Sequence, residues 1–314
     1  MLPPQTTEVA VDRPELAGMR LDLFLSEGLG LFSRSQARGR VQEALVNGKP
    51  ARLSKRLKLG DVVRVRWSEA PPMDLVPEDI PLEILYEDAN VIVVDKPQGM
   101  VVHPGSGNAS HTLANALVYH CAQVQALFPP GDLRPGIVHR LDKETSGVII
   151  VAKNPSAHEM LAGQFRARSV RKRYLALVRG RPKEEAGVID QRIARDRRHR
   201  KRFTGVASGG RQATTRYRVV QTIDGYSVLQ LAPRTGRTHQ LRVHLLHIGL
   251  PILGDPIYGT RDSRFPDATL MLHARSLTLL LPGESEPRRF VAAVPERFYE
   301  VLRELYSSSP RNGL

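Results

Sequence analysis

The pattern of hydrophobic and polar residues predicts a chain of mixed α and β structure. Short apolar runs rich in Val, Ile and Leu indicate strands at 91–94, 148–152, 174–178, 214–220, 228–231 and 277–281. Apolar residues at helical spacing indicate helices at 110–121, 155–168, 238–248 and 295–305. Successive strands near 174, 189, 216 and 229 have no helix between them, so an antiparallel arrangement is expected. The predicted fold class is α+β, with a mixed, largely antiparallel sheet and flanking helices.

A smaller α/β module is predicted before this sheet, over residues 12–68. Its first helix has an apolar face over 21–25, and a second helix, capped by Ser33 or Ser35, is predicted through Leu45. Asn47-Gly48 then indicates a tight turn before a strand at 62–65. Residues 69–90 hold four prolines and seven acidic residues without Lys or Arg, which predicts a stiff linker to a second domain over 91–305.

Positive charge is concentrated in one part of the chain. The 314 residues include 46 Lys or Arg and 32 Asp or Glu, a net charge of +14. The window 166–218 holds 18 basic and four acidic residues, an excess equal to the whole net charge. This excess indicates a polyanionic partner. Nucleic acid is favoured over an anionic membrane, because no amphipathic helix with a bulky apolar face accompanies the basic run.

Other sequence features exclude several classes of protein. No window approaches the roughly 18 uncharged apolar residues of a membrane span, and the start of the chain has no apolar signal segment. The single cysteine, Cys121, cannot form an internal disulfide. We therefore expect a cytoplasmic protein, by default a monomer with no obligate protein partner. The glycine-rich nucleotide motifs G-x-x-x-x-G-K-[ST] and G-x-G-x-x-G do not occur.

The first candidate for chemistry is the segment His139–Gly147, H-R-L-D-K-E-T-S-G, just before an apolar strand. Asp142 lies between Arg140 and Lys143, and nearby cations favour the ionised form of a carboxylate. An ionised carboxylate suits a nucleophile better than a general acid. The alternative is a charged turn with a purely structural role.

The second candidate is the segment Thr235–His244, T-G-R-T-H-Q-L-R-V-H, which opens a predicted helix at a turn glycine with one of its threonines as cap. His239 and Arg242 are three residues apart, so both can face one cleft. Arg242 is then expected to reach a buried carboxylate. The alternative is that Arg237 and Arg242 contact phosphate only.

Together these two segments resemble the RluA-type RNA pseudouridine synthases, for which the H-R-L-D-x-x-T-S-G pattern is highly specific. Lys96-Pro97 and the segment Gly254–Gly259, G-D-P-x-Y-G, support the resemblance, which runs from about residue 80 to 300. The segment Val101–Gly105, V-V-H-P-G, looks closest to the RluD subgroup, which acts on large-subunit ribosomal RNA. The resemblance implies the pseudouridine synthase fold for the larger domain.

The N-terminal module resembles an S4 RNA-binding domain. The matching segments are Arg20–Leu25, Ser33–Ala37, Val46–Gly48 and Gly60-Asp61. Residues 12–66 hold twelve Lys or Arg and six acidic residues, and Arg34 and Arg38 are among those available to an RNA backbone.

The resemblance implies an isomerisation of specific uridines in RNA that needs no cofactor and no metal. The glycosidic bond breaks, the uracil turns, and C5 bonds to C1′. By the match, Asp142 is the essential carboxylate, which attacks C1′ or removes a ribose proton, and Arg242 pairs with it. Tyr174 would stack on the target uracil and could help remove the C5 proton; the alternative is a strand tyrosine in the core. Further RNA-binding candidates are Arg140, which would fill the space of the flipped base, and Arg237, His239, Arg197, Arg198, Arg200, Lys201 and Arg202.

Three alternatives stay open at this point. The substrate could be transfer RNA in place of a large-subunit ribosomal RNA stem-loop. The chain could be a ribosome-associated RNA-binding protein that has lost activity, which predicts salt-dependent binding without turnover. A metal-dependent nucleic-acid hydrolase would need ligands such as His244 and His247, but no cysteine or nearby acid completes a metal site there.

Overall fold

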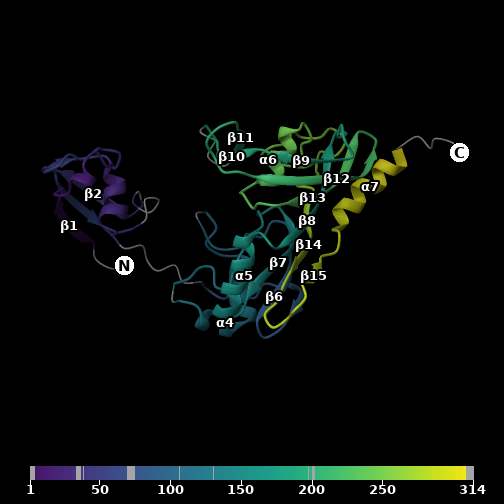
Figure 1. Ribbon diagram of the computed structural model, residues 1–314, viewed down its shortest axis with the longest axis horizontal. Coiled ribbons are helices and arrows are strands. Elements are labelled where there is room, and N and C mark those ends of the chain that lie inside the picture. The colour runs from purple at the N-terminus through teal and green to yellow at the C-terminus, as the bar shows by residue number, and fades with distance from the viewer. Residues whose placement is uncertain are drawn as a thin grey trace. The chain divides into compact units, whose positions relative to one another are not determined.

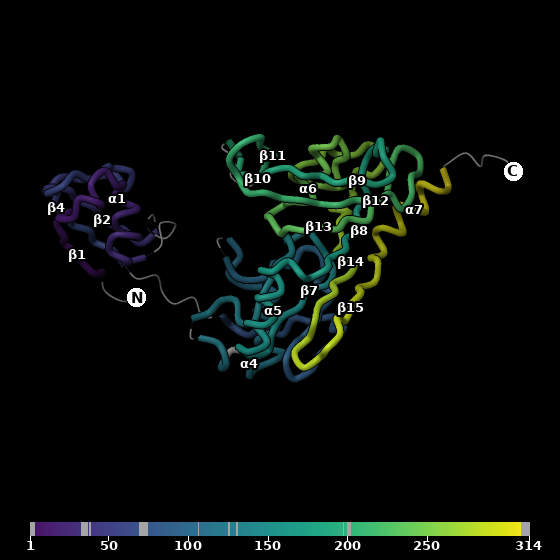
Figure 2. The backbone as a smooth tube through the Cα atoms, in the orientation of Figure 1, coloured from purple at the N-terminus to yellow at the C-terminus, as the bar shows by residue number. Residues whose placement is uncertain are grey.

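The computed structural model divides into two compact units, residues 1–73 and 74–314, drawn as a ribbon in Figure 1 and as a backbone trace in Figure 2. The residues that the structure describes are 4–32, 37, 39–68, 75–105, 107–129, 131–196, 198–199 and 202–308. Over this part of the chain, no helix combines the length and the apolar character that crossing a membrane requires.

The first unit contains a four-stranded antiparallel sheet in the order β1-β4-β2-β3. Its strands are β1 (Gln5–Ala10), β2 (Val41–Val46), β3 (Lys49–Pro50) and β4 (Val62–Trp67). The helical segments before β2 include η1 (Pro14–Leu16), α1 (Leu21–Leu23) and η2 (Phe24–Gly28), and the described residues Ala37, Gly39 and Arg40 are also helical. Leu21, Phe24 and Leu25 are buried, as the predicted apolar face requires, and they pack with alternate residues of β4.

The predicted helix through Leu45 is wrong over its second half, because Val41–Val46 forms strand β2. This stretch contains helix-forming residues, but it hydrogen-bonds to β4, and the pairing buries Ala44 and Val46 in the core of the unit. Asn47 and Gly48 have φ angles of 53° and 74° and form the predicted tight turn into β3. The first half of the predicted helix lies largely outside the described residues.

The second unit is built on a large mixed sheet, and this confirms the predicted fold class. The strand order is β5-β6-β7-β14-β8-β13-β12-β9, and β15 pairs with β14. All neighbouring strands are antiparallel except β7 and β14. The strands are β5 (Glu83–Glu87), β6 (Val91–Lys96), β7 (Ser146–Ala152), β8 (Arg171–Arg179), β9 (Ala186–Asp190), β12 (Thr214–Ile223), β13 (Tyr226–Pro233), β14 (Leu272–Leu279) and β15 (Arg288–Val291). A separate hairpin consists of β10 (Arg192–Arg195) and β11 (Phe203–Val206).

Helices cover both sides of this sheet. They are α3 (Leu113–His120), α4 (Ala122–Leu127), α5 (Pro155–Ala167), α6 (Gln240–His247) and α7 (Glu296–Ser308). Strand β7 is apolar from Val148 to Ala152 because both of its faces are covered: Val148 and Ile150 pack in the cluster of α5, and Ile149 and Val151 in the cluster of α3. In Figure 1, β6, β7 and α5 lie toward one end of the unit and β12, β13 and α6 toward the other.

The linker predicted over 69–90 is shorter than expected, because part of this acidic stretch belongs to the second unit. Glu83–Glu87 form the edge strand β5, paired with β6, and Tyr86 packs against Phe290 with ring centroids 5.4 Å apart. Leu75 is also buried, in a cluster with Ala114 and Val118. The linker prediction fails here because the apolar residues among these acids complete the core of the second unit.

The two halves of the sheet meet where β7 runs beside β14. The parallel pairing is short, with Ser146 opposite His273 and Gly147 opposite Ala274. Gly147 has a φ angle of 119°, and a Cβ atom there would lie 2.3 Å from the carbonyl oxygen of Ala274. Only glycine permits this close approach of the two backbones directly after the H-R-L-D segment.

Candidate active site

Both motifs of the sequence analysis line one cavity of about 440 Å³ in the second unit. The walls come from four parts of the chain: residues 138–145, the end of α5 with the start of β8, residues 233–242, and Leu272 on β14. Asp142, Tyr174 and Arg242 all line this cavity, as do Arg140, Arg237 and His239. The structure therefore brings together residues that the sequence analysis selected from three separate segments.

The loop that carries Asp142 is held at its start by His139. The imidazole stacks on Phe165 of α5 with ring centroids 4.5 Å apart, and its Nε2 accepts a hydrogen bond from the Ile150 backbone N–H at 3.1 Å. Burial, with a contribution from the positive charge of Lys172, lowers the pKa of His139 to about 3. A neutral imidazole can accept this hydrogen bond at physiological pH, so His139 has a structural role that sequence reasoning missed.

Lys96 holds the same loop from the other side. It is fully buried at the end of β6, and its Nζ donates to the carbonyl oxygens of Pro97 (2.7 Å), Met100 (2.9 Å) and Lys143 (3.3 Å). Burial lowers the pKa of Lys96 to about 8, against the opposing effect of Glu144 and Asp142. Because Lys143 directly follows Asp142, these hydrogen bonds restrain the backbone beside the candidate carboxylate.

Arg242 is the buried cation of the site. Its side chain is only 3% exposed, and its Nη1 lies 3.8 Å from Asp142 Oδ2. Its other two nitrogens are engaged elsewhere: Nε donates to Asp255 Oδ2 at 2.7 Å and Nη2 to Asp255 Oδ1 at 2.6 Å. Burial alone would lower the pKa of Arg242, but the two carboxylates raise it. Arg242 is therefore oriented by Asp255 and presents its remaining nitrogen to Asp142.

Asp255 belongs to the G-D-P-x-Y-G segment, and the sequence analysis assigned it no role. Its Oδ1 also accepts hydrogen bonds from the backbone N–H groups of Ile257 and Tyr258, at 2.9 and 3.0 Å. Burial alone would raise the pKa of Asp255, but the contacts with Arg242 and these N–H groups lower it. In the sequence, the only feature that points to this contact of Asp255 with Arg242 is its place in the G-D-P-x-Y-G motif.

Tyr258 continues the network from the same segment. Its ring centroid lies 5.0 Å from the Arg242 guanidinium carbon, and its hydroxyl is 2.8 Å from His239 Nδ1. His239, with a φ angle of 55°, precedes the first residue of α6, and neither threonine predicted as a cap fills that position. The hydroxyl of Thr235 instead bonds to the backbone of Thr214 and the side chain of Gln240.

Tyr174 reaches the cavity from β8. Burial, together with the negative charge of Asp142, raises the pKa of its phenol above the ordinary value. The side chain is therefore a neutral phenol at physiological pH, with an aromatic face and a hydroxyl donor.

Basic side chains surround the cavity. Arg140 is exposed, and Arg237 is partly exposed with its Nε bonded to the Gln212 carbonyl at 3.2 Å. Among the predicted residues on the β10–β11 hairpin, Arg198 is exposed and the Arg202 guanidinium carbon lies 5.5 Å from the Tyr258 ring centroid. The predicted RNA contacts Arg34, Arg38, Arg197, Arg200 and Lys201 lie outside the described residues.

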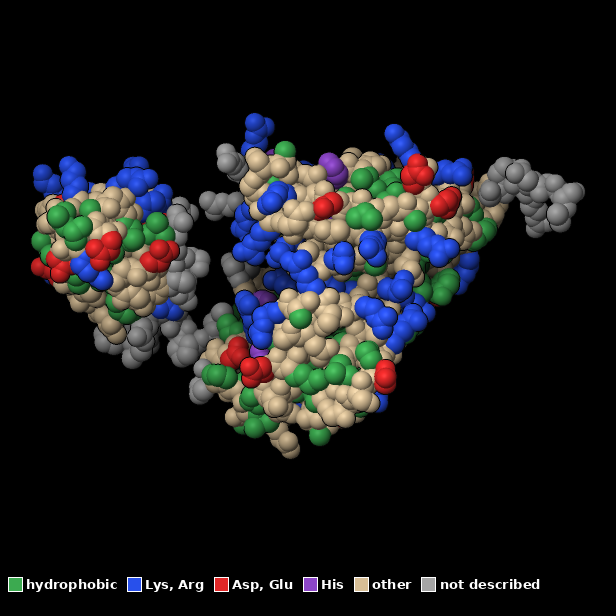
Figure 3. All heavy atoms as spheres, in the orientation of Figure 1, with side chains coloured by type: hydrophobic (Ala, Val, Ile, Leu, Met, Phe, Trp, Pro, Cys, Tyr) green, Lys and Arg blue, Asp and Glu red, His purple; other side chains and the backbone are tan. Residues whose placement is uncertain are grey.

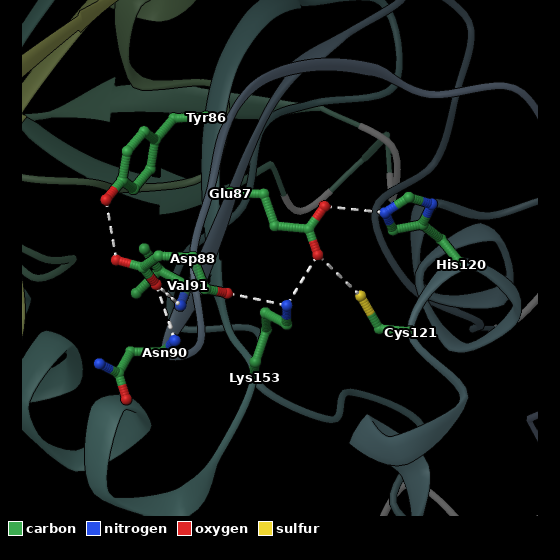
Figure 4. A network of polar contacts seen from close by, with 8 residues as sticks. All are labelled: Tyr86, Glu87, Asp88, Asn90, Val91, His120, Cys121 and Lys153. Carbon is green, nitrogen blue, oxygen red and sulfur yellow. Dashed lines mark hydrogen bonds and ion pairs between the residues drawn. The ribbon is translucent and has the colours of Figure 1, made fainter.

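One group of residues with metal-ligand chemistry occurs in the described chain, and it lies away from the cavity (Figure 4). His120 Nε2 is 2.9 Å from one carboxylate oxygen of Glu87, and the Cys121 thiol donates to the other at 3.5 Å. Lys153 already forms an ion pair with Glu87 at 2.7 Å. Partial burial would raise the pKa of Glu87, but these partners lower it to about 2. The network joins β5 to the end of α3 and to the residue after β7.

Of the two α6 histidines considered as metal ligands, His247 is exposed and His244 has other partners. The ring of His244 is buried, with Nδ1 3.0 Å from the Thr215 hydroxyl and Nε2 3.2 Å from the Gln191 carbonyl. These contacts connect α6 to β12 and to the residue before β10.

The chain is similar to known proteins along most of its length. Residues 90–247 match the family model described as RNA pseudouridylate synthase. A protein of Borreliella burgdorferi named ribosomal large subunit pseudouridine synthase D is 42% identical over 94% of this chain and 92% of its own length. A protein of the same name from Xanthomonas campestris is 39% identical over 96% of this chain and 93% of its own.

Solved structures give the same result. Human RNA pseudouridylate synthase domain containing 4 superimposes with a TM-score of 0.56 and 29% identity, covering 71% of this chain and 93% of its own. Human RNA pseudouridylate synthase domain containing 1 gives 0.57 and 26%, covering 74% and 97%. The chain that contains this cavity and its two motifs thus belongs to the family of RNA pseudouridine synthases, which are isomerases that act on uridine in RNA.

Proposed function

We propose that this enzyme modifies uridines in a stem-loop of large-subunit ribosomal RNA, with Asp142 as its essential carboxylate and without a cofactor. The observation that carries the proposal is that Asp142 lines the cavity 3.8 Å from Arg242, whose other nitrogens are held by Asp255. The names of relatives about 40% identical over most of the chain support ribosomal RNA over transfer RNA.

In the proposed reaction Asp142 acts on the ribose of the flipped uridine. It either forms a bond to C1′ or removes a ribose proton, and in both routes the N1–C1′ bond breaks and N1 keeps the electron pair. The uracil turns in the cavity and C5 bonds to C1′, as the Asp142–C1′ ester breaks in the first route or as the ribose regains its proton in the second. The C5 proton then leaves while N1 gains one. A cavity of about 440 Å³ lies within the range of about 300–1,000 Å³ typical of small-molecule sites. Exclusion of water keeps the detached base from being lost.

Tyr174 and Arg140 would position the base. A neutral phenol at Tyr174 suits stacking on uracil, because burial, followed by the charge of Asp142, raises the pKa of the phenol and disfavours a phenolate. Arg140, exposed at the cavity, would occupy the space that the flipped base leaves in the RNA. Flipping costs a few kcal/mol of unstacking and is easiest in loops, which favours a stem-loop target.

The first unit would provide a second RNA contact, as its S4-like sequence suggests. Its excess of basic residues suits an RNA backbone. A tethered second site increases the effective concentration of the catalytic unit near its RNA without new contacts at the uridine.

Tritium release from RNA labelled at C5 of uracil tests the proposal. Large-subunit ribosomal RNA is incubated with the natural protein, with Asp142→Asn, and with the control Asp267→Asn, which alters an exposed carboxylate whose side chain is 96% accessible. Each reaction is run with and without EDTA, and transfer RNA labelled in the same way is incubated in parallel. We expect release by the natural protein and the control and none by Asp142→Asn.

Each other outcome contradicts a stated part of the proposal. Release by Asp142→Asn at the natural rate would show that Asp142 is the wrong residue. Release from transfer RNA alone would overturn the substrate, and tight binding with no release from any RNA would favour a binding-only protein. Loss of activity in EDTA would contradict metal-free chemistry.

A further inference from the structure

We propose that the side of the sheet opposite the cavity binds a second segment of the RNA through its phosphates. The surface consists of five arginines, which we call the rear arginine face: Arg171, Arg173, Arg216, Arg218 and Arg289. The inference rests on the proposed function only in taking large-subunit ribosomal RNA as the RNA to be tested.

Strand alternation places these arginines away from the cavity. Lys172 and Tyr174 of β8 line the cavity, so their neighbours Arg171 and Arg173 project from the other side of the sheet. The same alternation separates Thr215 of β12, which is buried and bonded to Gln240 of α6, from its neighbour Arg216. The basic run of the sequence is therefore divided between two surfaces.

The register of the sheet brings the arginines of different strands to the same side. Arg171 lies opposite Thr278 of β14, and Thr278 lies opposite Arg289 of β15. Arg218 lies opposite Gln230 of β13, whose amide oxygen accepts a hydrogen bond from Arg173 at 2.7 Å. Residues directly opposite in a sheet share a face. With strands about 4.8 Å apart, the face extends roughly 19 Å from β15 to β12.

Helix α7 covers only part of this side. His273 of β14 lies opposite Leu175 of β8 and contacts the Phe298 ring of α7, with centroids 6.5 Å apart. Beyond this point the five arginines are all exposed. Figure 3 shows Lys and Arg side chains gathered over the strands labelled β8, β13 and β14 in Figure 1, with no acidic side chain among them in that view.

The charge of the rear arginine face is not compensated within the described part of the chain. None of the five arginines forms an ion pair there, and their partners in the sheet are uncharged: Thr278, Ser276, Ala232, Gln230, Val188 and Ala186. Asp190 lies further along β9 and is already bonded to Gln212 and Thr214. Exposed arginines without counterions bind phosphates and release condensed cations from the nucleic acid, which favours RNA as the partner.

A protein or a membrane fits this face less well. Protein interfaces depend on buried aromatic anchors, and membrane surfaces bind helices with a bulky apolar face. The large apolar side chains exposed on the strands of this face are only valines, Val188, Val220 and Val291, and the exposed aromatic residues Tyr299 and Tyr306 belong to α7. The nucleotides beside the target uridine would meet Arg140, Arg166 and Arg168 at the cavity. The rear arginine face, on the other side of the sheet, must therefore contact RNA distant from the target.

The test assays the full-length protein and its variants on two RNAs. The variant Arg171→Ala/Arg173→Ala/Arg216→Ala/Arg218→Ala is assayed on a large-subunit ribosomal RNA transcript and on the short stem-loop around the uridine mapped in the tritium experiment. We expect kcat/KM on the stem-loop to be unchanged. Affinity for the transcript should fall by at least about tenfold at 0.1 M salt, and the slope of log Kd against log salt should fall by about 3, or about 0.7 per lost phosphate contact.

Two control variants show whether RNA binding depends on the position of the four arginines or only on the total charge of the protein. Replacing the same four arginines by Lys keeps the charge and should retain most of the affinity. Removing four charges elsewhere, with Arg181→Ala, Lys183→Ala, Arg261→Ala and Arg303→Ala, should change transcript binding far less. An equal loss in this second variant would overturn the inference.

The remaining outcomes also decide the question. Unchanged transcript binding in the rear-face variant, with turnover intact, overturns this inference alone. An equal loss on the short stem-loop places the arginines at the target site and also overturns it. If the rear-face variant loses binding to polyglutamate, a model of an acidic protein, but keeps its RNA affinity, the rear arginine face binds a protein instead. Absence of turnover in the natural protein, with arginine-dependent transcript binding, overturns the proposed function and leaves this inference standing.

Discussion

Arginine has opposite surroundings in two regions of the second unit. Arg242 is 3% exposed, and two carboxylates surround it, one of them with no exposed side-chain surface. The rear arginine face is exposed and has no carboxylate partner among the described residues. Burying a charge is costly unless it is paired, so Arg242 is compensated and held in one geometry. Water compensates the exposed arginines, which leaves their charge available to a ligand.

The largest effect is expected from breaking the buried pair with Asp255→Asn. This change leaves Arg242 charged, buried and without its bidentate partner, which should cost about 3–5 kcal/mol of unfolding free energy. Displacement of Arg242 should also lower kcat by about 100-fold. Denaturant unfolding and tritium-release kinetics measure the two effects.

Asp262→Asn is the matched control for this prediction. Asp262 is also buried, and it accepts hydrogen bonds from Tyr226, Arg264 and Phe265, but it does not line the cavity. We expect lower stability with unchanged kcat. An unchanged kcat in Asp255→Asn as well would show that orientation by Asp255 is irrelevant to catalysis.

A smaller effect tests whether a buried basic group that is not paired with a carboxylate stays neutral. His273 is fully buried, 3.0 Å from the Ser146 hydroxyl, and burial, followed by the charges of Arg297 and Arg275, lowers its pKa to about 4. Between about pH 6.5 and pH 4, unfolded His273 binds a proton that the folded form does not bind. Stability should therefore fall as the pH drops through this window, by at most about 1.4 kcal/mol per pH unit.

Thermal unfolding from pH 7 to pH 4 measures this effect. His273→Asn keeps a polar group near Ser146 but removes the titration, so its melting temperature should decrease less with falling pH than that of the natural protein. Parallel curves for the two proteins would argue against a neutral His273.

The smallest effect is expected on the exposed side. Arg216→Ala removes an exposed charge without an ion pair, so the melting temperature should change by less than about 2 °C. Calorimetry checks this value. A large decrease would mean that the rear arginine face contributes to folding, and the contrast with Arg242 would then fail.

Sequence reasoning predicted the structure correctly where the hydrophobic pattern or motif of a single segment determines it. The apolar run at 148–152 is strand β7, and the two motif segments meet at one cavity. It failed at Val41–Val46, where pairing with β4 decides between strand and helix, and a single segment does not reveal its partner. The bonds from Arg242 to Asp255 and from Lys96 to Lys143 join residues distant in sequence, so neither has a periodic signal.

The order of strands in the sheet has a consequence for synthesis of the chain on the ribosome. Strand β14 lies between β7 and β8, although it follows both in sequence and contributes Leu272 to the cavity wall. A nascent chain that ends before Leu272 already contains both motifs, but the strand that joins the two halves of the sheet is missing. Long-range pairing of this kind forms late, so the active site of each new copy is completed only after Leu272–Leu279 has been synthesised.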